Sequence, residues 1–327
     1  MDVCGPDCPQ MTGIATGFHL TCERESFSPA SQRRNLIEPA YSAAIQPLIV
    51  GIINLHTNSH KLSTTLLLLG SVFASASTSF AQTAEMSEED LAKKAQNPIS
   101  SMVSLPLQNN TDFDFGPEEG TLNTLNVQPV WPFAISDDWN LVTRTILPIV
   151  SQPGLAPGQG RENGLGDINF TGFFSPKEAG KWIWGVGPTV ILPTSTDDRL
   201  GKGEWGAGVS MVVLTMPGNW VVGSLFSNVW DVSASTGNEI NFFTWQYFIN
   251  YNLPNGWYLT SSPVITADWE ADSKQRWTVP VGGGVGKIFR VGKQALNAQV
   301  HAYYNVEKPD IKGDWGMRLQ LQFMFPR

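Results

Sequence analysis

The chain has 327 residues, of which 42% are hydrophobic and only 15% are charged, and its net charge is −8. Soluble globular domains usually carry about a quarter charged residues, so the composition does not favour an ordinary cytosolic enzyme. An acidic chain lacks the basic face that neutralises phosphates, so no nucleic-acid partner is expected. Outside one short stretch, the sequence has no apolar run long enough for a membrane helix. If the protein meets a membrane, it must cross it as a β-barrel.

Residues 61–81, KLSTTLLLLGSVFASASTSFA, have the organisation of a signal peptide. A basic residue precedes the apolar core Leu62–Phe73, and Ser79-Phe80-Ala81 supplies small residues before a cleavage site ahead of Gln82. The apolar core is too short to span a bilayer as a helix. Because a signal peptide begins at the N-terminus, residues 1–60 are interpreted as a mis-called extension from a translation start placed too far upstream. A true cytoplasmic extension is the alternative.

Residues 82–98 are predicted to form a short periplasmic helix or a linker. Ser87 is placed to cap a helix, and Glu88 and Glu89 suit its first turn, where the helix dipole favours negative charge. Pro98 ends the segment, because proline cannot continue a helix.

From 99 to 327 the sequence predicts an all-β fold, an antiparallel transmembrane β-barrel of twelve strands. In FFTWQYFINY, apolar residues including Trp245 and Ile249 share one face, while Gln246 and Asn250 share the other. Short connections such as PNG alternate with long ones such as STDDRLGKGE, as in outer-membrane barrels. The expected strands are 99–108, 121–132, 139–150, 165–175, 181–193, 205–216, 220–231, 240–252, 257–269, 276–288, 294–305 and 315–325.

A soluble β-sandwich also alternates polar and apolar residues. Sandwich strands are shorter, however, whereas these strands suit a tilted span of the hydrocarbon layer. Tryptophans also gather at the strand ends, where the aromatic girdles of membrane proteins lie. The members of this group are Trp139, Trp205, Trp220, Trp230, Trp257, Trp269, Trp277 and Trp315.

The polar positions that face the lumen in this register form the candidate site. They carry amide, hydroxyl and aromatic groups with little charge, which suits uncharged molecules with an apolar body better than ions. Arg144 fits neither face, because Val142 and Ile146, two residues away on each side, are apolar. The lumen-lining candidates are Asp167, Asn169, Thr171, Thr244, Gln246, Asn250, Asp268, Asn297, Gln299, His301, Tyr303, Arg318, Gln320 and Gln322.

The sequence offers no catalytic residue, metal site or cofactor site. Cys4, Cys8 and Cys22 include one closely spaced pair, but no second pair of zinc ligands follows. The run Gly282–Lys287 lacks the spacing of a phosphate-binding loop, so close packing of strand backbones is the favoured interpretation. His301 has no identifiable serine partner, so a lumen-lining or structural role is favoured over that of a base in a lipid hydrolase.

Five segments carry a family resemblance: NPISSMVSLPLQNN (97–110), LNVQPVWPF (125–133), DWNLVTRTILPIV (138–150), GLGDINFTGFFSPKEAG (164–180) and GVGPTVILPT (185–194). They resemble a bacterial outer-membrane transporter family of the MetA pathway of phenol degradation, often labelled "neuromedin U" in bacterial genomes. The resemblance extends over 97–327. It implies transport of aromatic or other hydrophobic molecules and identifies no ligand-binding residues.

The expected function is an outer-membrane transporter or channel for small hydrophobic or aromatic molecules in a Gram-negative bacterium. Its expected partners are outer-membrane lipid, those solutes and the barrel-assembly machinery, although two residues follow Phe325 where that machinery usually meets a terminal aromatic. A lipid-modifying enzyme and a structural barrel without transport are the alternatives. A serine in contact with His301 would favour the enzyme, whereas an open lumen or a lateral gap would favour transport.

Overall fold

The computed structural model describes residues 87–178, 180–232 and 239–326, which all belong to one compact unit, Ser79–Arg327. The predicted extension at 1–60 and the predicted signal peptide at 61–81 lie outside the described residues. Within the described ranges, no helix has both the length and the apolar composition needed to cross a membrane.

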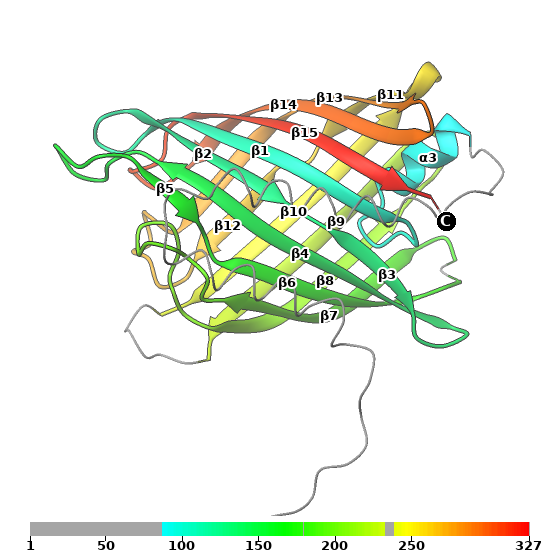
Figure 1. Ribbon diagram of the computed structural model, residues 1–327, viewed down its shortest axis with the longest axis horizontal. Helices are drawn as coiled ribbons and strands as arrows, with labels where there is room; N and C mark the ends of the chain where they lie inside the picture. The colour runs from blue at the N-terminus through cyan, green and yellow to red at the C-terminus, as the bar shows by residue number, and fades with distance from the viewer. Residues whose placement is uncertain (1–86, 179, 233–238, 327) are drawn as a thin grey trace, which may run out of the picture. The chain divides into compact units, whose positions relative to one another are not determined.

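The described chain is one short helix followed by strands (Figure 1). In chain order the elements are α3 (Glu88–Ala95), β1 (Val103–Phe115), β2 (Gly120–Val127), β3 (Val130–Ala134), β4 (Trp139–Gln152), β5 (Glu162–Leu165), β6 (Ile168–Pro176), β7 (Ile183–Leu192), β8 (Gly206–Thr215), β9 (Trp220–Asp231), β10 (Asn241–Asn252), the 3₁₀ turn η3 (Pro254–Gly256), β11 (Trp257–Ser261), β12 (Val264–Asp268), β13 (Trp277–Val291), β14 (Gln294–Glu307) and β15 (Trp315–Phe325).

These strands form a closed antiparallel barrel. Each span pairs with its neighbours in chain order, and β15 returns to pair with β1 from Val103–Phe325 to Asp112–Gly316, which closes the ring. The segments β2 and β3, β5 and β6, and β11 and β12 are three spans interrupted in the middle, so fifteen segments make twelve strands. The predicted fold class is confirmed.

Side chains alternate between the two faces of the barrel wall. On β14, Val300 is 41% and Tyr304 is 39% exposed, whereas Asn297 and His301, on the other face, are fully buried. On β15, Leu319 is 44% exposed and its neighbour Arg318 only 8%. An apolar outer face and a polar inner face are the arrangement of a barrel that spans a membrane.

Aromatic side chains form a girdle at each end of the barrel. At the end with short turns, the rings of Trp139 and Trp184 lie 5.9 Å apart, edge to face. At the end with long loops, the rings of Trp269 and Trp277 lie 5.5 Å apart, and Trp315 at the start of β15 is 53% exposed. Indole rings favour the two membrane interfaces, because their bodies are apolar and their N–H groups are polar.

The chain before β1 enters the barrel at the short-turn end, where Figure 1 shows α3 beside the end of β15. Ser87 caps α3, because its hydroxyl accepts a hydrogen bond from the N–H of Asp90 at 3.1 Å. Leu91 and Ala92 are buried against a cluster that includes Tyr258 on β11 and Met324 on β15. We call residues 88–102 the plug segment.

The plug segment also explains a difference from the sequence prediction. β1 begins at Val103 and not at residue 99, because the chain from 99 to 102 packs inside the lumen before it joins the wall. Ile99 is buried with Val142, Phe173 and Phe248, which project from three different strands. The interior at the short-turn end is therefore an apolar core, and the polar lumen lies beyond it.

We expect Leu319→Arg to lower the free energy of unfolding by about 2–4 kcal/mol, the cost of a cation near the bilayer midplane. Leu319 lies in the middle of β15 on the outer face. Thr244→Arg, on the same face of β10 as the inward residue Gln246, is the matched control and is expected to cost less. A urea titration of protein refolded into lipid vesicles measures both. Equal losses would contradict the assigned faces.

Candidate functional site

A cavity of about 150 Å³ lies in the lumen between the plug segment and the polar wall. Residues 95–98 and 100 of the plug segment border it on one side, and the barrel wall contributes the rest of its lining through β1, β3, β4, β9, β10, β11, β14 and β15 and the interruptions at Gln128 and Ser262. Apolar contributions come from Val130, Leu225 and Phe248, so the cavity is amphipathic. Its polar lining consists of Gln96, Asn97, Ser100, Ser104, Gln108, Gln128, Arg144, Gln246, Asn250, Thr260, Ser262, Gln299, Arg318, Gln320 and Gln322.

Two arginines line this cavity. Arg318 donates from Nε to Asn110 Oδ1 at 3.0 Å and from Nη1 to the carbonyl of Ser262 at 2.9 Å, so its side chain reaches across from β15 to the break between β11 and β12. Arg144 on β4 donates from Nη2 to Gln128 Oε1 at 2.9 Å. The sequence alone does not decide which face of the wall Arg144 occupies, because its neighbours on the same face are apolar. Val142, one of these neighbours, belongs to the interior core.

A ladder of polar side chains runs along the inner face of β14. The two ring nitrogens of His301 lie 2.9 Å from Gln299 Oε1 and 2.9 Å from the hydroxyl of Tyr303. Toward the short-turn end, the hydroxyl of Tyr258 donates to Asn297 Oδ1 at 2.5 Å, and Asn297 donates to a further glutamine of the lining. The hydrogen bonds fix these side chains against the wall.

The structure distributes the sequence-predicted site residues over five places. Asn297, His301 and Tyr303 are buried on β14 beside the cavity, and Asn169 and Thr171 are joined to Thr189 by hydrogen bonds between β6 and β7. Thr244 is half-buried on β10, and Asp167 and Asp268 lie at the long-loop end. Six of the predicted residues line the cavity itself: Gln246, Asn250, Gln299, Arg318, Gln320 and Gln322.

The two predicted aspartates contact the outer loops. Asp167 Oδ1 accepts from the N–H groups of Thr194 and Ser195 at 3.1 and 3.0 Å, and its Oδ2 accepts from the N–H of Gly203 at 3.1 Å. Asp268 accepts from the N–H of Glu270 and forms an ion pair with a loop lysine at 3.7 Å. Both carboxylates therefore hold loops and contribute no lining to the cavity.

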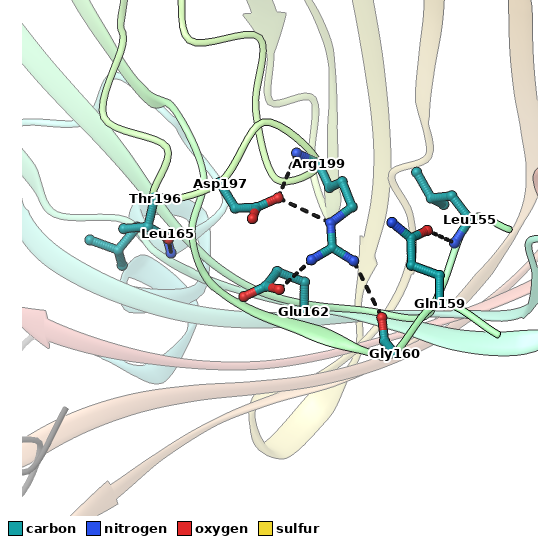
Figure 2. A network of polar contacts seen from close by, with 8 residues as sticks. All are labelled: Leu155, Gln159, Gly160, Glu162, Leu165, Thr196, Asp197 and Arg199. Atoms are coloured by element: carbon teal, nitrogen blue, oxygen red, sulfur yellow. Dashed lines mark hydrogen bonds and ion pairs between the residues drawn. The ribbon is translucent and has the colours of Figure 1, made fainter.

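A second polar network, centred on Arg199, joins the loop after β4 to the loop after β7 (Figure 2). Its guanidinium pairs with Glu162 and with Asp197 Oδ1, the latter at 3.1 Å, and also donates to the carbonyl of Gly160. The backbone N–H and the guanidinium of Arg199 lower the pKa of the Asp197 carboxyl. The network fixes the arrangement of these outer loops.

The longest lapse in strand pairing among the described strands lies between β12 and β13. β11 pairs with β13 as far as Thr260–Gly284, and pairing resumes only at Thr266–Thr278. Pro263 lies within the unpaired stretch, and proline has no N–H to donate to the ladder. Thr260 borders both the lumen cavity and a depression on the outer face. We call the unpaired stretch between the pairs Thr260–Gly284 and Thr266–Thr278 the seam.

The sequence matches one known family over most of its length. Residues 108–321 match the family model described as "Putative MetA-pathway of phenol degradation". The chain belongs to this family. The resemblance seen in the sequence is therefore confirmed. No protein of curated function matches the sequence.

Three solved structures illustrate how the family's barrel compares with others. An outer membrane channel from Pseudomonas putida F1 has a TM-score of 0.54 and 18% identity, and the match covers 70% of this chain and 96% of that chain. The CymD monoaromatic hydrocarbon channel has a TM-score of 0.39 and 7% identity, covering 74% and 91%. The Salmonella typhi outer membrane phospholipase has a TM-score of 0.35 and 13% identity, covering 75% and 99%. Only the first is similar enough to support the fold.

The fold fixes the location of the protein. A closed barrel pairs its strands within the wall and leaves no open sheet edge, and this barrel also has an apolar outer face and a girdle at each end, which is the arrangement that a hydrocarbon layer requires. The protein is a Gram-negative outer-membrane barrel.

Proposed function

We propose that the protein transports small hydrophobic or aromatic molecules across the outer membrane. The observation that carries this proposal is the amphipathic lumen cavity, in which Phe248 and Leu225 face a set of amide side chains. Small-molecule sites combine apolar walls with a few fixed polar groups in this way. The family supports the same proposal through its description as part of a phenol-degradation pathway.

The seam offers a second route for an apolar solute. Ile249 and Leu259 border the outer depression, and Thr260 connects its rim to the lumen cavity. The hydroxyl of Ser261 donates to the carbonyl of Gly282 at 2.6 Å, a side-chain contact in place of the missing ladder. A molecule that leaves the lumen here would enter the hydrocarbon layer without crossing the plug segment.

The contacts of His301 argue against the lipid-modifying enzyme. A histidine that acts as a base for a serine nucleophile must contact that serine. The ring nitrogens of His301 instead contact Gln299 and Tyr303 at 2.9 Å each. The cavity in the lumen likewise favours transport over a purely structural barrel.

The proposal is tested by two measurements on the same protein. We expect the purified barrel to conduct salt poorly in planar bilayers, because the plug segment fills one end of the lumen. Cells that express the protein are expected to take up toluene, a neutral aromatic, faster than cells with an empty vector, while uptake of glucose is unchanged. A large ion conductance that toluene does not affect, with no change in toluene uptake, would indicate a general porin instead.

A further inference from the structure

The lumen cavity has two cations and no carboxylate in its lining. Arg144 and Arg318 supply the charge, and neither forms an ion pair with any aspartate or glutamate of the described residues. Asp112, two positions from Asn110 on the inner face of β1, pairs with Lys312 at 3.4 Å. Asp112 still attracts Arg318 electrostatically, whereas the charged neighbour of Arg144 is Arg318 and not a carboxylate. A desolvated cation without a counter-charge is costly, so an anion beside Arg144 would be stabilised.

The two guanidinium groups differ in how many donors they leave free. Arg318 is held in place by its hydrogen bonds to Asn110 and to the carbonyl of Ser262. Arg144 has one hydrogen bond, to Gln128, and its Nε and Nη1 groups have no partner among the described residues. A planar guanidinium with free N–H groups matches the geometry of a carboxylate, which accepts two parallel hydrogen bonds.

The rest of the lining suits an aromatic body. Phe248, Leu225 and Val130 face the same space as the arginines, and the cavity volume is about 150 Å³. A cavity of roughly this volume holds a benzene ring in another protein. Charge and apolar surface therefore occur together within one small site.

We infer that the cavity binds a small aromatic monocarboxylate, with its carboxylate against Arg144 and Arg318 and its ring against Phe248. The inference rests on the proposed transport of aromatic molecules and names a substrate class for it. This inference departs from the expectation that the lumen suits uncharged molecules better than ions, because that expectation did not place Arg144 in the lumen.

Calorimetric titration of the purified barrel in detergent tests the inference with two probes. Benzoate carries the carboxylate, and benzamide has the same ring without the charge. We expect benzoate to bind about tenfold or more tightly than benzamide, the difference that a charge-assisted hydrogen bond supplies. Arg144→Gln is expected to remove this preference and to leave benzamide binding unchanged.

The matched control is Lys181→Gln, which removes one positive charge at an exposed position in the turn before β7. It is expected to bind benzoate as the parent does. Arg144→Gln keeps a polar side chain of similar reach, and the heat-modifiable mobility of the barrel on a gel reports whether it folds. As a second readout, the reversal potential of the parent barrel in a salt gradient is compared with that of each variant. Arg144→Gln is expected to shift it toward cation selectivity, and Lys181→Gln is expected to leave it unchanged.

Two outcomes would overturn the inference: equal affinity for benzoate and benzamide, or benzoate binding that survives Arg144→Gln in a folded barrel. Faster toluene uptake without benzoate binding would overturn this inference and leave the proposed function standing. Arg144-dependent benzoate binding without any change in aromatic uptake would support the site and count against transport.

Discussion

Tyr258→Ala is expected to lower the free energy of unfolding by about 3–5 kcal/mol, the usual cost of deleting a large buried aromatic side chain. The Tyr258 side chain is 1% exposed and contacts the plug segment through Leu91. A Cβ on Gly286, the residue that pairs with Tyr258 on the neighbouring strand β13, would come within 2.1 Å of the tyrosine ring, so the ring already lies directly over this strand. Removal of the ring leaves a cavity that neither the wall nor the plug segment can fill.

Tyr258→Phe separates packing from hydrogen bonding in the same position. It keeps the ring and removes the hydroxyl, which donates to Asn297 Oδ1 at 2.5 Å, so a smaller loss of about 1–3 kcal/mol is expected. Urea titrations of refolded protein in vesicles measure both variants. Equal losses for the two substitutions would show that the ring itself contributes little.

The alternation of side chains made the wall predictable from the sequence. A two-residue period over a strand fixes which residues share a face, and the pairing of β14 with β15 places Gln299 opposite Gln320 and His301 opposite Arg318. The two-residue period alone assigns each of these four residues to the inner face. Most strand spans were also predictable, because turns and tryptophans mark the ends; the exception is β1, which was expected at 99–108 and is Val103–Phe115.

The contents of the lumen were less predictable, because they depend on contacts between distant parts of the chain. Ile99 looked like the start of a strand, yet it packs beside Phe173 on β6. Arg144 follows Val142 on the inner face, and a rule that assigns only polar residues to the lumen cannot place both. Gln128, which binds Arg144, carries no sequence signal at all, since it lies at the break between β2 and β3.

The loop anchors show a second limit of periodicity. Asp167 lies two residues before Asn169, so the two-residue period assigns both side chains to the lumen. It lies in the break between β5 and β6, where its carboxylate turns to three backbone N–H groups of the loop after β7. Side-chain direction at a strand interruption follows local hydrogen bonding and not the two-residue period.

Deletion of residues 87–98 is expected to raise the single-channel conductance several-fold. This stretch buries Leu91 and Ala92 in the cluster that includes Tyr258 and Met324, and Gln96 forms two hydrogen bonds with Asn252 on the end of β10, at 2.8 and 3.4 Å. Barrels of eight strands are filled by side chains, and barrels of sixteen enclose an aqueous channel. At twelve strands the wall leaves space that the plug segment occupies, so removal of all of it except residues 99–102 opens a path for ions.

The deletion is expected to leave the barrel folded, because the ring closes through β1 and β15 without any contribution from the deleted residues. A chain that begins at Ser87 is the matched control and should conduct as the parent does, since it keeps α3 and its cap. Gln96→Ala tests the attachment alone: loss of the contact with Asn252 should cause brief openings within an otherwise closed record. Unchanged conductance in a deletion variant that still shows a folded barrel on a gel would mean that the plug segment does not control access to the lumen.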